Sequence, residues 1–104
     1  MLSVGFLHVA AAQVAATRRL VAEHAPWLTD VHLVDETLLA LPPGRELARR
    51  LSARVGELAG RDIDVLVCPS PELLPDVREV AARCGLPVIG LEQLAAGGPL
   101  ALAG

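Results

Sequence analysis

The feature that most constrains this chain is a regular alternation between short apolar runs and longer segments with helical periodicity. Four apolar runs are typical of buried strands, and they lie at 2–7, 31–34, 63–67 and 87–91. Strands that are buried on both faces need not alternate polar and apolar residues, so these runs suit a parallel sheet. Between them, apolar residues recur every three or four positions, as on one face of a helix. We therefore predict the order β-α-β-α-β-α-β.

The three predicted helices have recognisable limits. The first runs from Ala10 to Pro26, because proline cannot continue a helix. The second lies between the turn sequence PPG at 42–44 and Gly60, a natural helix stop. The third presents a stripe from Leu73 to Cys84 that we expect to be buried.

Repeated β-α units require right-handed crossovers, which place helices on both faces of the sheet. We predict one α/β domain over 1–96, followed by a Gly/Ala-rich tail at 97–104. The predicted domain is a flavodoxin-like three-layer sandwich with a four-stranded parallel sheet in the order 2-1-3-4. A chain of 104 residues suffices for one core. With one Phe, one Trp and no Tyr, that core must consist mainly of Leu, Val and Ala.

Charge and hydropathy argue against two classes of partner. The net charge is −3 and all nine basic residues are arginines scattered along the chain, so we expect no nucleic-acid binding. We also expect no membrane span, because Arg18 and Arg19 interrupt the N-terminal apolar stretch well short of ~18 strongly apolar residues. We do not expect this stretch to be a signal peptide, because no positively charged segment precedes it.

The two cysteines predict a reducing compartment. If the segment between Cys68 and Cys84 is mostly helix, they lie roughly 18 Å apart, too far for a disulfide. Free thiols are typical of the cytoplasm, where we therefore expect the protein.

Chemically versatile residues follow the predicted strands. Because parallel strands end at one edge of the sheet, we expect these residues to surround a ligand pocket there. They are His8 after the first strand, Asp35, Glu36 and Thr37 after the second, Cys68, Pro69 and Ser70 after the third, and Glu92 after the fourth.

Each candidate also has a purely structural interpretation. Cys68 would be an activated thiolate at a helix N-terminus, or a small buried residue at a strand end. Prolines 69, 71 and 75 lack N–H groups and weaken any anion site there. Ser70 would bind a carboxylate or cap a turn. His8 would transfer a proton or hydrogen-bond to neighbouring loops.

The acidic residues after the second predicted strand also have a functional and a structural interpretation. Asp35 and Glu36 would orient an amine or act as acid and base, although an Asp after a strand commonly caps the next turn. His24, His32 and Cys84 have no metal-ligand spacing, so we expect no metal site.

Several motifs together resemble the first lobe of the aspartate/glutamate (hydantoin-type) racemase superfamily. They are GFLHV at 5–9, VHLVDETLL at 31–39, DVLVCPS at 64–70 and LPVIGLEQ at 86–93. The resemblance implies cofactor-independent proton transfer at a carbon next to a carboxylate, by two facing cysteines, one from each lobe. This chain holds one such lobe. Strict matching of the third motif aligns Pro69 with the family's cysteine and Cys68 with the residue before it.

Two hypotheses follow from the resemblance, and neither needs a cofactor. In the first, the chain is a degenerate single lobe that binds a small carboxylate or amino acid, or a module that forms dimers. Its ligand-binding residues would be Ser70, Asp35, Glu36, Thr37 and Pro69. In the second, it is an amino-acid or hydantoin racemase whose site, with Cys68 and His8 as catalytic residues, is assembled between two subunits of a homodimer or higher homo-oligomer.

Overall fold

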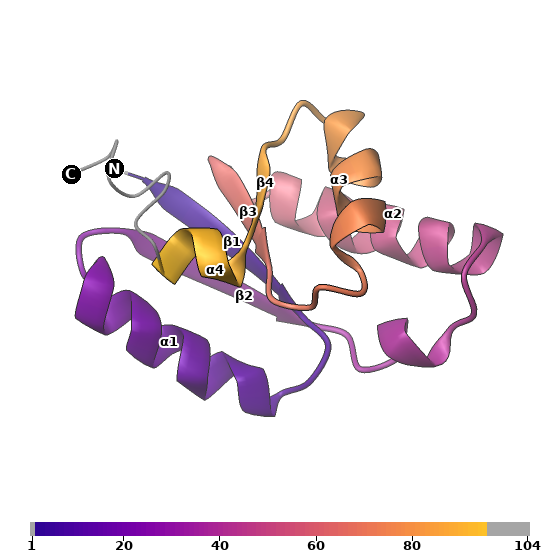
Figure 1. Cartoon of the computed structure of the whole chain (residues 1–104). Helices are drawn as coiled ribbons and strands as arrows, with labels where there is room; N and C mark the ends of the chain where they lie inside the picture. The colour runs from indigo at the N-terminus through magenta and orange to yellow at the C-terminus, as the bar shows by residue number, and fades with distance from the viewer. Residues whose placement is uncertain (1, 96–104) are drawn as a thin grey trace.

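The computed structural model describes residues 2–95, in which strands and helices alternate as predicted (Figure 1). The elements are β1 (Ser3–His8), α1 (Ala12–His24), β2 (Thr29–Val34), the 3-10 turn η1 (Leu38–Ala40), α2 (Arg45–Ala59), β3 (Val65–Cys68), α3 (Leu74–Ala82), β4 (Val88–Gly90) and α4 (Leu91–Ala95). All strands are parallel and lie in the order β2-β1-β3-β4, which confirms the predicted fold.

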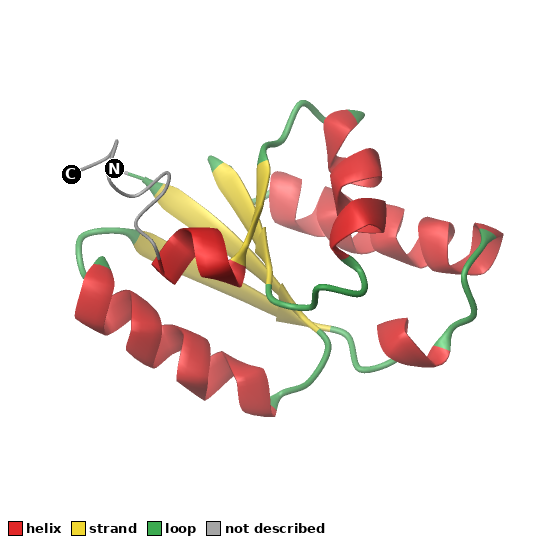
Figure 2. Cartoon of the chain, in the orientation of Figure 1, coloured by secondary structure: helices red, strands yellow, loops and turns green. Residues whose placement is uncertain are grey.

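The helices form a layer on each face of the sheet. Helices α1 and α4 cover one face, and α2 and α3 cover the other (Figures 1 and 2). Right-handed crossovers on the two sides of β1 produce this arrangement, because the chain first moves outward to β2 and then returns past β1 to β3.

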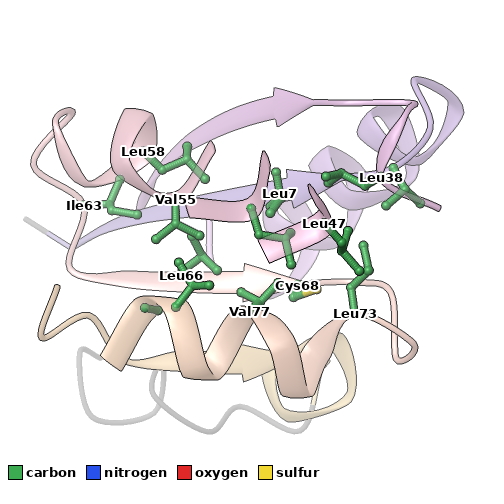
Figure 3. Packing of buried hydrophobic residues seen from close by; sticks show 14 residues of the cluster. Leu7, Leu38, Leu47, Val55, Leu58, Ile63, Leu66, Cys68, Leu73 and Val77 are labelled. Carbon is green, nitrogen blue, oxygen red and sulfur yellow. The ribbon is translucent and has the colours of Figure 1, made fainter. Parts of the chain in front are cut away.

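The sheet separates two apolar clusters. The larger lies under α2 and α3 and contains Leu7, Leu66 and Cys68 (Figure 3). The smaller lies under α1 and contains Phe6 and Val67. Neighbouring residues of a strand thus enter different clusters, as the period-two geometry of a strand requires. The face of each side chain near the candidate site is set by this alternation.

Gly5 allows a close approach between β1 and the segment before β3. A Cβ atom at this position would lie 2.6 Å from Ile63 Cδ1, closer than side chains tolerate. Glycine therefore lets the end of the Ile63 side chain pack against β1, and the residue serves packing rather than an unusual backbone angle.

The structure differs from the prediction at the ends of helices. Helix α3 ends at Ala82, and the following residues turn tightly into Gly85, whose φ is 67°. Cys84 is consequently exposed, so its predicted place in a buried stripe is wrong. The short elements η1 and α4 were not predicted, and the predicted tail at 97–104 lies outside the described residues. Within residues 2–95, no helix is long and apolar enough to cross a membrane.

Candidate functional site

The predicted site residues lie at the carboxyl edge of the sheet, but on different faces. Phe6 pairs with Val67 in the β1–β3 register, and paired residues of parallel strands face the same side. His8 therefore shares the α1 face with Phe6, on which it stacks. Cys68 belongs to the cluster on the α2 and α3 face. The structure does not bring His8 and Cys68 together.

Cys68 has the surroundings of a structural residue. Only 2% of it is exposed, and its thiol donates a hydrogen bond to the Ser70 carbonyl, 3.4 Å away. Burial raises the pKa of the Cys68 thiol, and the Ser70 hydrogen bond only partly offsets this. Figure 3 shows the residue among the apolar side chains of its cluster, beside Val77 and Leu73. A buried, protonated thiol is a poor nucleophile and a poor base.

Ser70 and Pro69 shape the loop between β3 and α3. The buried Ser70 hydroxyl donates to Glu72 Oε2 at 2.9 Å, and the Ser70 carbonyl accepts from Leu73 N–H at 3.2 Å. Ser70 thus organises the loop and does not cap α3, which has no side-chain cap. Pro69 lines a pocket described below.

Asp35 is the centre of a polar cluster at the end of β2. Its carboxylate accepts hydrogen bonds from Thr37 N–H at 3.0 Å, the Thr37 hydroxyl at 2.5 Å and Arg54 Nε at 2.8 Å. Burial alone would raise the pKa of Asp35, but the hydrogen bonds from Thr37 and Arg54 outweigh it and lower the pKa to about 2. This carboxylate closes the turn after the strand and holds α2 against it.

Glu36 also makes an internal bond. Its Oε1 accepts from the Ala11 N–H at 3.3 Å, at the start of α1. The acidic groups after β2 are therefore used to fix the turn and the first helix, and they lie apart from the pocket at β3 and β4.

Sequence reasoning missed a chain of hydrogen bonds on the α1 face. His8 Nε2 lies 2.8 Å from His32 Nδ1, and His32 Nε2 lies 2.6 Å from Asp30 Oδ2. The rings of Phe6, His8 and His32 stack nearly parallel, with 4.9 Å between Phe6 and His32. The spacing of Asp30 and His32, two apart on one strand, was the available signal, because such residues share a face.

The acceptor at the end of this series of hydrogen bonds, Asp30, decides where one of the protons lies. The Asp30 carboxylate can only accept, so His32 Nε2 carries a proton. The donor of the hydrogen bond between His8 Nε2 and His32 Nδ1 depends on the tautomers of the two rings. Among residues 2–95, His8 Nδ1 is the buried side-chain polar atom that has no hydrogen-bond partner.

His8 is held neutral by its environment. Burial lowers its pKa from 6.5 to about 4; repulsion from His32 adds to this effect and the Gln13 side chain opposes it. No part of the residue is exposed. His8 is therefore unsuited to donate a proton to a ligand at neutral pH.

A pocket of about 300 Å³ opens at the carboxyl ends of β3 and β4. Its walls come from the β3–α3 loop, α3 and the start of α4, and its lining residues are Cys68, Pro69, Pro71, Leu74, Arg78, Gly90, Leu91, Glu92 and Gln93. Of the predicted residues, Cys68, Pro69 and Glu92 line it, whereas His8, Asp35, Glu36, Thr37 and Ser70 do not. Arg78 was missed, because its position on a helix face gave it no signal in the sequence.

Hydrogen bonds fix the polar side of this pocket. Gln93 Oε1 accepts from Gly90 N–H at 2.9 Å and from Arg78 Nη2 at 3.4 Å. Within residues 2–95, Arg78 forms no ion pair. Over the same residues, no group of three or more His, Cys, Asp or Glu is placed to hold a metal ion.

Comparison with protein-family models, with curated proteins and with solved structures finds no match for this chain. The resemblance to racemases therefore stays a prediction from the motifs.

Proposed function

We propose that this protein is a racemase-like single lobe that binds a small amino acid or carboxylate and does not transfer protons. The observation that carries the proposal is the pocket at β3 and β4, which combines an apolar wall with one cationic and one anionic side chain, Arg78 and Glu92. An amino acid offers a carboxylate and an ammonium group close together, which is the complementary pattern of charge.

Arg78 has donors to spare for a ligand. Its contact with Gln93 is long, at 3.4 Å, and the partner is a neutral amide oxygen. A carboxylate is a stronger partner for a guanidinium group, because the hydrogen bonds are charge-assisted and can form in pairs. A ligand carboxylate would therefore displace the amide or join it.

The surroundings of Cys68 support binding over catalysis. The thiol borders the pocket, yet it is buried, its pKa is raised, and it donates to a backbone carbonyl. His8, the other predicted catalytic residue, lies on the opposite face of the sheet. A racemase assembled between two subunits needs a thiolate open to the partner, which these surroundings disfavour.

Ligand titration followed by amide chemical shifts tests the binding site. L-Aspartate, L-glutamate and succinate are the probes, and shifts should concentrate at Gly90 and in the β3–α3 loop. Arg78→Gln should weaken binding about tenfold or more, because it removes a charged donor. Arg83→Gln is the matched control, since Arg83 is exposed, lies just beyond α3 and pairs with Glu79. Equal affinity in both variants would contradict the proposal.

Incubation of the same amino acids, and of a hydantoin, in D₂O distinguishes binding from catalysis. We expect no deuterium at the α-carbon with the wild-type protein, and unchanged ligand affinity in Cys68→Ala. Incorporation that disappears in Cys68→Ala would instead establish the racemase.

A further inference from the structure

We infer that the pocket at β3 and β4 selects α-amino acids with an apolar side chain and discriminates against aspartate and glutamate. The inference rests on the proposed function, because it names the class of ligand that the same pocket would take. The charges and the apolar surface of the pocket lead to it.

The charged groups of the pocket match one carboxylate and one ammonium group. Among the described residues that line it, Arg78 is the only cation and Glu92 the only anion. Both side chains are exposed, and within residues 2–95 neither forms an ion pair, with the other or with a third residue. The α-carboxylate of an amino acid would use Arg78, and its α-ammonium group would use Glu92. Neither charge then remains for the ligand's side chain.

A second carboxylate on the ligand would lack a charged partner. Pro69 and Pro71 line the pocket without an N–H group, and the Gly90 N–H already donates to Gln93 Oε1 at 2.9 Å. The amide group of Gln93 lies beside Arg78, so its nitrogen would serve the same carboxylate as Arg78. Taking a carboxylate out of water without a charged partner is unfavourable. Aspartate and glutamate should therefore bind more weakly than neutral amino acids.

The rest of the lining suits an apolar side chain. Pro69, Pro71, Leu74 and Leu91 form an apolar wall. Leu74 packs on the cluster on one face of the sheet and Leu91 on the cluster on the other, so both are held in place. A Cβ atom at Gly90 would lie 3.4 Å from Leu74 Cδ2, so glycine leaves room beside this wall. Burial of the ligand's apolar surface there is favourable in proportion to its area.

Ligands that differ in one group test this inference on the wild-type protein. The side chains of L-leucine, L-asparagine and L-aspartate have the same number of heavy atoms in the same branched arrangement, but they differ in polarity and charge. Calorimetric titration should give affinities in that order, with L-leucine about tenfold or more tighter than L-aspartate. The compound 4-methylpentanoate is leucine without its ammonium group. It should bind about tenfold more weakly than L-leucine, because it offers Glu92 no partner.

Three variants connect the selectivity to particular residues. Glu92→Gln should weaken binding of L-leucine about tenfold and should not weaken binding of 4-methylpentanoate. Pro71→Arg places a second cation in the apolar wall at an exposed position, so it should raise the affinity for L-aspartate about tenfold relative to L-leucine. Pro75→Arg is the matched control, because Pro75 is exposed in the same segment and does not line the pocket. It should leave the ratio of affinities unchanged.

The outcomes separate this inference from the proposed function. Selectivity for L-leucine that Pro71→Arg reduces and Pro75→Arg preserves supports the inference. L-Aspartate that binds as tightly as L-leucine, or more tightly, and loses affinity in Arg78→Gln would overturn the selectivity but keep the pocket as the binding site. Binding of no ligand in the series, or binding that Arg78→Gln leaves unchanged, would overturn both.

Discussion

The buried histidine gives the protein a specific dependence of stability on pH. In the unfolded chain His8 takes up a proton as the pH falls through 6.5, whereas in the folded chain it does so only near a pKa of about 4. Between these values the unfolded state binds more protons, so the free energy of unfolding falls as the pH falls. The contribution of His8 to the free energy of unfolding is fully present above pH 6.5. It falls as the pH falls, and below the folded pKa of about 4 His8 causes no further loss.

The size of the effect follows from the two pKa values. At about 1.4 kcal/mol per pH unit, the interval from 6.5 to about 4 corresponds to a loss of roughly 3 kcal/mol. For a domain of this size that is a large part of the expected stability of about 5–15 kcal/mol. The effect must be measured as a difference between variants, because this removes every contribution that the variants share.

Urea denaturation across this pH range provides the measurement. The single tryptophan, Trp27, and far-ultraviolet circular dichroism report unfolding. His8→Gln retains an amide donor toward His32 and cannot titrate. Between pH 6.5 and about 4, the free energy of unfolding of this variant should therefore fall by roughly 3 kcal/mol less than that of the wild type. His24→Gln, at an exposed position, should follow the wild type. Parallel curves for wild type and His8→Gln would refute the assignment of a buried neutral His8.

Three further predictions concern stability and reactivity. Asp35→Asn should lower the free energy of unfolding by about 2–3 kcal/mol in urea denaturation at neutral pH, because Thr37 and Arg54 lose a charged, buried acceptor; a change within error would contradict this. Gly5→Ala should cost about 1–3 kcal/mol through overpacking against Ile63, and the double variant with Ile63→Val should recover part of it in the same assay. A thiol reagent should modify Cys84 rapidly and Cys68 only as the protein unfolds, since only the former is exposed; equal rates would show that Cys68 is open.

The sheet was predictable because its signal is periodic and repeated. Each apolar run is long enough to be a strand, each helix has an apolar stripe, and chirality leaves few ways to connect them. Helix ends were less predictable. The stripe from Leu73 to Cys84 continues in sequence beyond the point where the backbone turns toward Gly85, so periodicity alone placed Cys84 wrongly.

The candidate site was predictable only in its location. The carboxyl edge follows from topology, but the facing of each side chain depends on register, and one step along a strand reverses it. His8 and Cys68 both end strands, yet the β1–β3 register puts them on opposite faces. Arg78 could not be found this way, because it contributes from a helix and depends on how α3 packs beside β4.

The proline-rich loop explains why binding would depend on Arg78. In parallel α/β folds, backbone N–H groups after a strand commonly hold an anion. Here Pro69 and Pro71 lack such groups, and the Ser70 hydroxyl is bound to Glu72. The loop therefore supplies an apolar wall, and the donors for a carboxylate must come from a side chain. Arg78 lines the same pocket and has only a weak neutral partner, so it is the group on which the affinity for a carboxylate should depend.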